Sequence, residues 1–285
     1  QCESCWKNLP SEAKQTQRYQ MVELPAVRLR VSEWQRHCVS CPDCGHETWG
    51  SMASIPSTSF GPRLSAVIGL LTGFYHLSRR ATVRFLSDVL GTEISLGAVS
   101  AVEERVSESV KPAVAEAWET IEAAPVKHTD GTSWYQSHAL CALWTIATSA
   151  VTVFKILANG QATTLAPLFG KCVGILVSDR ATALKFWVMA RRQICWAHLL
   201  RKAISFSERD GPSAAIGHEL LDYITLIFDY WHRFKAGTLS REQFRSLMAP
   251  VRQNVEGVLT RAAAQKLGQL SGSCADILEH RAALW

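Results

Sequence analysis

The sequence predicts an α/β fold with a mixed sheet between residues 121 and 210, and the order of its strands carries this prediction. Three β-rich runs come first, at residues 125–129, 140–148 and 151–157. A continuous apolar run at 173–177 then indicates a strand buried on both faces. A last short strand is expected at 193–195, between two helical segments. Three leading strands followed by alternating helices and strands are typical of a mixed sheet.

Three other regions surround the expected sheet. They are a turn-rich region at 1–59 with strand-like runs at 21–24 and 27–31, a helical region at 60–120, and a second helical region at 211–285. We expect Pro112 and Pro250 to end the helices in which they occur, because proline removes a backbone donor. The chain opens at Gln1 without a methionine and stops at Trp285 within a helical pattern, which predicts a piece of a longer protein.

Composition places the chain among globular proteins. Hydrophobic residues make up 47% of its 285 residues and charged residues 19%, which excludes wholesale disorder and fibrous architecture. The longest apolar stretch, 64–77, is shorter than the roughly 18 apolar residues that suggest a membrane span. No basic-then-apolar leader is visible, so we expect a cytoplasmic protein with no membrane partner. Thirty Lys and Arg against 25 Asp and Glu give a net charge of +5, which permits a nucleic-acid partner.

Paired cysteines near the start of the chain predict a zinc site. Five of the nine cysteines lie in the first 44 residues, and without an export signal this crowding indicates metal binding in a reducing compartment. Two Cys-x-x-Cys hooks can complete a tetrahedral Zn²⁺ site. The expected ligands are Cys2, Cys5, Cys41 and Cys44, and the substitutes available for one of them are His37, Cys38 and His46. The alternative is that these are small buried residues in a poorly packed terminal piece.

Two helical segments between residues 78 and 112 form a helix-turn-helix candidate. Ser78 can cap the first helix, Gly91 can end it, and Ser95 can cap the second. An αα-hairpin with no DNA-binding role has the same pattern. Glutamates on the second helix weaken the DNA-binding interpretation, whereas arginines on the first favour it. The candidate DNA-binding residues here are Arg79, Arg80 and Arg84.

Asp130 and Asp179 are each expected at the end of a strand of the sheet. Carboxylates at the ends of adjacent strands can converge on hard divalent cations, which prefer oxygen ligands. Two such ions can stabilise both the attacking and the leaving oxygen of a phosphoryl displacement. Two ordinary interpretations stay open. Asp130-Gly131 is also typical of a hairpin turn, and an Asp after a strand is also typical of a helix N-cap.

A second polar motif, Cys195-Trp196-Ala197-His198, lies at a predicted strand-to-helix junction. A thiol and an imidazole at this spacing can bind a metal or act as nucleophile and base, but a buried cysteine beside a hydrogen-bonded histidine is more common. We expect Cys195 and His198 to support the junction beside the active site. The cations nearby are Arg191, Arg192, Arg201 and Lys202. Those cations fit either a phosphate backbone or a solvated basic face.

Sequence blocks spread over essentially the whole chain carry a family resemblance. They are Ser59-Phe60-Gly61-Pro62-Arg63-Leu64, Leu71-Thr72-Gly73, Leu77-Ser78-Arg79-Arg80, Ile94-Ser95-Leu96-Gly97-Ala98-Val99-Ser100, Val177-Ser178-Asp179-Arg180, the run from Arg192-Gln193 through Cys195-Trp196-Ala197-His198-Leu199-Leu200-Arg201, and Trp231-His232-Arg233-Phe234. In this order they resemble transposases of the insertion sequence 66 family. The Cys-Trp-Ala-His-Leu-Leu-Arg segment together with Ser-Asp-Arg is the specific part of the match.

The resemblance implies a domain plan. It implies a four-cysteine zinc finger at 1–59, a helical DNA-binding region at 60–120, an RNase H-like catalytic core at 121–210 and a helical insertion at 211–285. It further implies an Asp-Asp-Glu triad in which Asp130 matches the first carboxylate and Asp179 the second, with Mg²⁺ or Mn²⁺ as cofactor. Gly131 departs from the family, which often has a glutamate there, and Ala181-Thr182-Ala183 lacks an aromatic that is common near the second Asp.

The third carboxylate of the triad is not found in this chain. In the family it lies beyond the helical insertion, in a segment resembling Asn-Asn-x-x-Glu-Arg, and the sequence contains no such segment. Four glutamates fall in the expected insertion and match nothing there, namely Glu219, Glu242, Glu256 and Glu279. We therefore expect the chain to lack the catalytic Glu.

The expected function is that of a DNA transposase of a bacterial insertion sequence, a mobile element, that cuts and joins DNA strands. The resemblance implies DNA partners, namely the terminal inverted repeats of the element and target DNA. It also implies a homo-oligomer in the active complex, accessory proteins of the element and a location with the nucleoid in the cytoplasm. The alternative is a catalytically inactive, truncated DNA-binding protein that occupies element ends.

Overall fold

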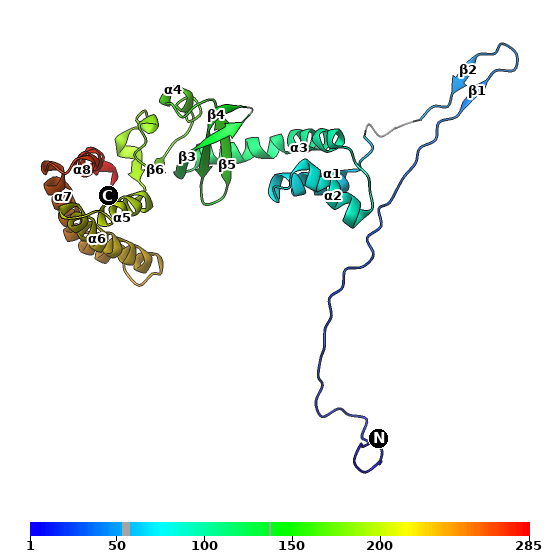
Figure 1. Cartoon of the computed structure of the whole chain (residues 1–285), viewed down its shortest axis with the longest axis horizontal. Coiled ribbons are helices and arrows are strands. Elements are labelled where there is room, and N and C mark those ends of the chain that lie inside the picture. Colours follow the sequence, from blue (N-terminus) through cyan, green and yellow to red (C-terminus); the bar gives the residue numbers. More distant parts are fainter. Residues whose placement is uncertain (53–57, 137) are drawn as a thin grey trace. The chain divides into compact units, whose positions relative to one another are not determined.

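The computed structural model describes residues 1–52, 58–136 and 138–285. The chain divides into two compact units, Gln1–Val110 and Lys111–Trp285, and helix α3 (Leu96–Ala123) contributes to both (Figure 1). The protein is an α/β protein with one mixed sheet in its second unit. No helix among the described residues is both long and apolar enough to span a membrane.

The first unit begins with chain that has turns but no helix or strand through residue 37. The expected strands at 21–24 and 27–31 do not form, because their apolar side chains find nothing to pack against: Val22 is 98% exposed. A small antiparallel hairpin follows, made of β1 (Cys38–Ser40) and β2 (Glu47–Trp49).

The helical region of the first unit packs around its own small core. It comprises α1 (Pro62–Gly69), a π-helical turn η1 (Leu70–Phe74), α2 (Arg79–Leu90) and the first part of α3. Ser78 caps α2 by accepting from the amide of Ala81 at 3.2 Å, and Gly91 ends α2 in the left-handed conformation. Ser95 caps α3 by accepting from the amide of Ala98 at 3.1 Å. These caps confirm the helix boundaries that the sequence predicts.

Helix α3 continues through Pro112, so the expectation that this proline ends the helix is wrong. A proline inside a helix costs about 3 kcal/mol or more. The second half of α3 offsets this cost by burying apolar surface, since Ile121 is fully buried and Trp118 packs against the same core. Each fully buried large side chain contributes about 1.5–3 kcal/mol. Residues that follow the proline therefore decide whether the helix continues.

The second unit contains a five-stranded sheet of order β5-β4-β3-β6-β7. The strands are β3 (Val126–Gln136), β4 (Ala139–Ala147), β5 (Thr152–Leu157), β6 (Ile175–Ser178) and β7 (Arg192–Ile194). β3, β4 and β5 are antiparallel neighbours, whereas β3, β6 and β7 run parallel. The expected mixed sheet is confirmed. The expected helix at 161–169 is reduced to α4 (Ala162–Leu165) and the turns after it.

Asp130 and Gly131 lie inside β3 and do not form the turn that was one of the two interpretations of this dipeptide. They pair with Thr145 and Trp144 of β4. A Cβ atom at Gly131 would come within 2.9 Å of ring atoms of Trp144, so the indole takes the space of a side chain at this position. The glycine therefore serves close packing between two strands.

The face of the sheet on which Trp144 lies is covered by apolar side chains of α3, α4 and the loop after α4. Trp144 and Ile146 of β4 pack there with Ile121, Leu165 and Phe169, and all five are buried. Along β3 the alternation of side chains leaves Lys127 and Thr129 buried but His128 and Asp130 exposed. One face of the sheet thus holds the core, and the opposite face presents Asp130.

Four helices follow the sheet and form a second apolar core. They are α5 (Trp196–Ser207), α6 (Pro212–Lys235), α7 (Arg241–Ala264) and α8 (Gln269–Glu279) (Figure 1). α7 continues through Pro250, so the predicted end of a helix there is wrong. Val251, Val255 and Val258 lie beyond the proline and are buried, which again offsets the lost hydrogen bond.

The helices α5 to α8, together called the helical part, are followed by η4 (Arg281–Ala283), where the chain returns to the sheet. The main-chain oxygen of Leu284 accepts from Gln193 Nε2 at 3.1 Å and from Trp196 Nε1 at 3.0 Å. The rings of Trp285 and Trp196 lie 5.1 Å apart between centroids. The chain therefore leaves the sheet after Ile194 and comes back to the same edge strand.

Candidate active site

Asp130 and Asp179 lie at equivalent positions on neighbouring parallel strands. His128 of β3 pairs with Val177 of β6, and each aspartate stands two residues further along its own strand direction. Side chains two residues apart share a face, and His128 and Asp130 are on the exposed one. Asp179 follows directly after the last residue of β6 and is half-buried. The expectation that the two carboxylates come from adjacent strands therefore agrees with the register, but the expectation that Asp130 ends its strand is wrong, because β3 continues to Gln136.

Asp130 faces the first turn of α5. Its side chain is 60% exposed, and its Oδ2 lies 3.7 Å from Nε2 of His198. Its other oxygen accepts from the amide of Gly131 at 2.9 Å. Within the described part of the chain, Nδ1 of His198 is buried and has no hydrogen-bond partner. Cys195 is the N-cap residue of α5, and its amide donates to the main-chain oxygen of Ser178 at 2.8 Å. The main chain at Cys195 thus fixes where α5, with His198, begins.

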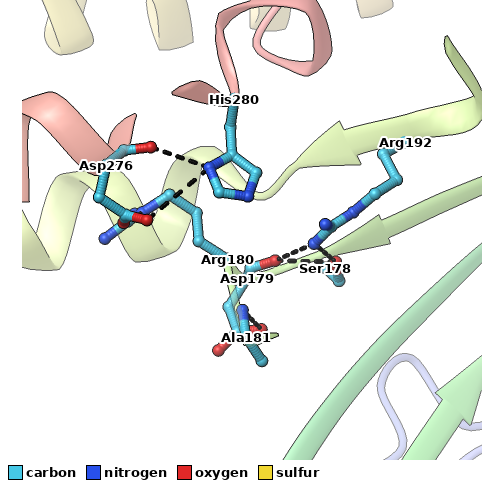
Figure 2. Close-up of polar contacts among 7 residues, drawn as sticks. All are labelled: Ser178, Asp179, Arg180, Ala181, Arg192, Asp276 and His280. Atoms are coloured by element: carbon cyan, nitrogen blue, oxygen red, sulfur yellow. Dashed lines mark hydrogen bonds and ion pairs between the residues drawn. The ribbon is translucent and has the colours of Figure 1, made fainter. Parts of the chain in front are cut away.

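Asp179 is held through its main chain by a buried arginine (Figure 2). Nη2 of Arg192 donates to the Asp179 main-chain oxygen at 3.0 Å and to Ser178 Oγ at 3.2 Å. The Asp179 carboxylate itself accepts from the amide of Ala181 at 3.0 Å, but it does not cap a helix as one interpretation expected, because the 3-10 helix that follows (Thr182–Leu184) has Ala181 as its N-cap. Burial lowers the pKa of Arg192, and the nearby charge of Asp179 opposes this shift.

Arg192 was expected to contact DNA, but the structure buries it. Only 4% of the residue is exposed, and its Nε and Nη1 atoms are buried with no hydrogen-bond partner among the residues that the structure describes. A buried guanidinium cannot meet a phosphate backbone at the surface, so the Arg192 assignment is corrected. Its contacts with Ser178 and Asp179 give it a different role, which is to fix the end of β6.

The residue after Asp179 reaches across to the helical part. Nε of Arg180 lies 2.7 Å from Oδ2 of Asp276 on α8 (Figure 2). Behind this pair, Nδ1 of the buried His280 lies 2.8 Å from the main-chain oxygen of Asp276. Sequence reasoning did not find Asp276 or His280, because no local motif links positions that are 96 residues apart.

A wide, open groove of about 620 Å³ adjoins Asp179. Its lining residues are Asp179, Arg180, Ala181, Thr182, His198, Arg201, Lys202, Ser205 and Asp276. Four of them come from one face of α5, at the spacing of successive helical turns. Arg201 and Lys202, both expected to bind DNA, therefore lie in the same groove as the second aspartate. Such a groove can accept a phosphate backbone beside Asp179 and His198, the latter being the residue that Asp130 faces.

The two cysteine hooks each form a tight turn. The amide of Trp6 bonds to the oxygen of Cys2, and the amide of Gly45 bonds to the oxygen of Cys41. Main-chain amides lower the pKa of both leading thiols, chiefly the amide of Ser4 at Cys2 and that of Cys44 at Cys41. Lowered thiol pKa values favour the thiolate that binds Zn²⁺.

The structure does not bring these hooks together. In the described part of the chain, no group of three or more His, Cys, Asp or Glu is close enough to hold a metal ion. The donor chemistry of each hook fits zinc, and the four-cysteine site stays a prediction.

The three arginines of the helix-turn-helix candidate lie on the surface of α2. Arg79, Arg80 and Arg84 are all exposed. Nε of Arg79 lies 2.7 Å from Oε2 of Glu103 on α3, so this arginine has an acidic partner within the unit. Glu103, one of the glutamates that weaken the DNA-binding interpretation, is thus the counter-ion of Arg79, one of the candidate DNA-binding residues.

Comparison with known proteins identifies the family. Residues 58–283 match the family model described as Transposase IS66 family. The match covers the helical region of the first unit, the sheet with Asp130 and Asp179, and the helices up to η4. No curated protein compared with the chain matches it. The chain belongs to the IS66 family of transposases.

Proposed function

We propose that the chain carries the strand-cutting and strand-joining site of a DNA transposase from a bacterial insertion sequence. One observation supports this most strongly. Asp130 and Asp179 stand in register on neighbouring strands, beside a groove that contains Arg201 and Lys202. Carboxylates and cations so arranged suit phosphoryl transfer, because the carboxylates can hold divalent cations and the cations can hold the phosphate backbone.

An RNase H-like catalytic core with a helical insertion is part of this proposal. The order β5-β4-β3-β6-β7, with three antiparallel strands followed by two parallel ones, supports it. The helices between Trp196 and Glu279, which start and finish at β7, support the insertion. The hairpin and hooks at the start of the chain fit a zinc finger.

Asp130 and Asp179 are the residues that would hold Mg²⁺ or Mn²⁺. When bound, the metal would stabilise negative charge on the phosphate under attack. Other residues near the metal would orient the first aspartate, hold the main chain at the second, and bind the DNA backbone. His198 lies beside Asp130 and can keep its carboxylate oriented, while Arg192 keeps the main chain at Asp179 in place. Arg201 and Lys202 would hold the backbone of the DNA along α5.

We further propose that the third carboxylate comes from a Glu outside residues 1–285. Two of the four glutamates in the helical part already have partners there. Glu219 accepts from Nη2 of Arg261 at 2.7 Å and 2.8 Å. Glu256 accepts from Arg252 at 3.0 Å and from Trp285 at 2.9 Å. Two aspartates alone bind a metal pair weakly, because a further anionic ligand is needed against the hydration of the second ion.

The partners follow from this reaction. The DNA would include the terminal repeats of the element and the target site, with the helical region and its Arg80 and Arg84 as further contacts. We propose that the active complex is a homo-oligomer, assisted by accessory proteins of the element, and works on the nucleoid in the cytoplasm.

The test is DNA nicking with Mg²⁺ or Mn²⁺. Residues 1–285 alone should bind duplex DNA at low salt and nick it little or not at all. The protein extended by a Glu-bearing segment should nick element ends, and Asp130→Asn or Asp179→Asn should each abolish nicking without loss of binding. Asp229→Asn on the exposed face of α6 is the control and should leave nicking unchanged.

Two results would count against the proposal. Nicking by the extended protein that survives Asp179→Asn would exclude the metal-ligand role and favour a purely structural role for Asp179, through its bond to the amide of Ala181. Binding to element ends without nicking, in every form of the protein, would instead favour the inactive DNA-binding protein that occupies those ends.

A further inference from the structure

The ion pair between Arg180 and Asp276 lies in the lining of the basic groove. Arg180 directly follows Asp179, and Asp276 belongs to α8 of the helical part (Figure 2). Their closest atoms, Nε and Oδ2, lie 2.7 Å apart. The groove therefore contains an acid from the helices at the point where DNA would pass the second proposed catalytic residue.

The charge of Asp276 is unlike that of its neighbours in the groove. Arg180, Arg201 and Lys202 supply positive charge, and the other acidic lining residue, Asp179, is a proposed metal ligand. A carboxylate in such a place repels a phosphate backbone. It also resembles one, because a guanidinium binds carboxylate and phosphate oxygens with the same hydrogen-bond geometry.

Both partners are held in place from behind. Arg180 follows the main chain that Arg192 fixes at Asp179. Asp276 is backed by the buried His280, whose Nδ1 lies 2.8 Å from the main-chain oxygen of Asp276 and 3.9 Å from its Oδ1. The ion pair is therefore positioned before any DNA arrives.

The exposure of the two side chains differs in a way that favours exchange. Asp276 is 46% exposed, whereas Arg180 is 16% exposed. A carboxylate that gives up its partner can be hydrated at once, because almost half of it already meets solvent. The guanidinium, in contrast, needs another anion, since burying it without a partner is costly.

We propose that Arg180 is a phosphate-binding residue of the groove and that Asp276 occupies its guanidinium until a DNA backbone phosphate replaces it. The proposal rests on the proposed function, in that DNA lies in this groove. It assigns to α8 a contact that competes with DNA next to Asp179. A phosphate bound to Arg180 would then be fixed one residue away from a proposed metal ligand.

The experiment compares four variants of the full chain for binding to a mixed-sequence DNA duplex across a range of salt concentrations. Asp276→Asn keeps the shape of the side chain and removes its charge, so it should tighten binding about three- to tenfold. Asp229→Asn, which breaks an exposed Arg–Asp pair on α6, removes the same charge elsewhere and should tighten binding much less. Arg180→Gln should weaken binding and reduce the salt slope by about 0.9. The double variant Arg180→Gln with Asp276→Asn should bind like Arg180→Gln.

The opposing interpretation is a structural ion pair that only fastens α8 to the end of β6. It predicts a lower melting temperature for Asp276→Asn with no gain in DNA affinity, and that result would overturn the inference. Equal tightening by Asp229→Asn, or tightening that persists in the double variant, would overturn it as well. If Asp276→Asn does not fold, an unchanged salt slope in Arg180→Gln decides against it.

Failure of the underlying function gives a different pattern. Arg201→Gln and Lys202→Gln remove groove cations that have no part in the ion pair. If neither variant weakens DNA binding, the groove is not the DNA path, and both proposals fall. If both weaken it but Asp276→Asn does not tighten it, only the inference about Arg180 fails.

Discussion

Gly131 and Trp144 are cross-strand partners in which the indole ring of one covers the α-carbon of the other. A Cβ at Gly131 would meet ring atoms at 2.9 Å, closer than packed atoms approach. Trp144 is 5% exposed, so the ring has little room to move. The pair lies next to Asp130 on β3, so its packing bears directly on one end of the candidate active site.

Substitution of Gly131 should therefore destabilise the second unit. Gly131→Ala should lower the free energy of unfolding by about 1–3 kcal/mol, and Gly131→Glu by more, because each forces the indole to shift. Urea unfolding followed by tryptophan fluorescence measures this. Gly160→Ala is a suitable control, since a Cβ there makes only an ordinary 3.7 Å contact. A neutral Gly131→Ala would show that the ring moves aside freely.

Lys127 should contribute to stability through its buried amine. It is fully buried, and Nζ donates to the main-chain oxygens of Ala124 and Val173. Lys127→Met leaves both oxygens without this donor and should cost about 1–3 kcal/mol. Chemical unfolding at neutral pH measures the loss. Lys155→Met on β5 is the control, because its amine contacts the ring of Trp118 and should cost less.

The pH dependence of stability gives a second test of Lys127. Burial lowers the pKa of Lys127 from its ordinary value of 10.5. The unfolded chain then holds the proton more tightly than the folded one, so stability should rise with pH between the folded pKa and 10.5. The rise should be absent in Lys127→Met. A profile identical in both proteins would mean that Lys127 does not titrate differently on folding.

Zinc content checks the four-cysteine site. If the two hooks share an ion, the purified protein should carry about one Zn²⁺ per chain, and Cys41→Ser should lose most of it. Plasma emission spectroscopy measures the content. Cys38→Ser tests the substitute ligand and should keep its zinc, since Cys38 begins strand β1 outside both hooks. Unchanged metal in Cys41→Ser would exclude this assignment.

Cys195 should act through its main chain and not as a thiol nucleophile. Its amide bonds the oxygen of Ser178, and serine at the same N-cap position can keep that bond and add a cap. Cys195→Ser should therefore reduce nicking by the extended protein only modestly and leave the melting temperature close to that of the parent. Complete loss of nicking, with folding and DNA binding intact, would show a direct chemical role for the thiol.

Strands β5 and β6 could be predicted closely from sequence because each is a local apolar run, whereas β3 extends to Gln136, past its expected end at 129, through mostly polar residues. The run at 173–177 contains β6 apart from its last residue, and the run at 151–157 contains all of β5. Helix caps were predictable for the same reason, as Ser78 and Gly91 act on amides and carbonyls within their own turns. Asp130 and Asp179 could be placed on adjacent strands because the order of strands limits the topology of the sheet.

What the sequence could not provide were effects of distant partners. The local sequence of Asp130-Gly131 is compatible with a turn, and the contact that shows otherwise comes from Trp144 on another strand, whose ring lies over Gly131. Pro112 and Pro250 were expected to end helices, but burial of later residues outweighs the lost bonds. Arg192 looked like a surface cation, and the Arg180–Asp276 pair could not be anticipated, since both depend on how the helical part folds back.

The return of Leu284 to the edge of β7 has a consequence for how this family can vary. The segment between Ile194 and Leu284 connects two points beside β7, because Leu284 is hydrogen-bonded to Gln193 and Trp196. With respect to the sheet it is a single long connection. The closure entropy of a loop grows slowly, by about 0.6 kcal/mol for each doubling of its length. The closure term therefore allows this segment to differ in length at little cost, provided that helices still cover Ile194 and Arg180 still finds an acid.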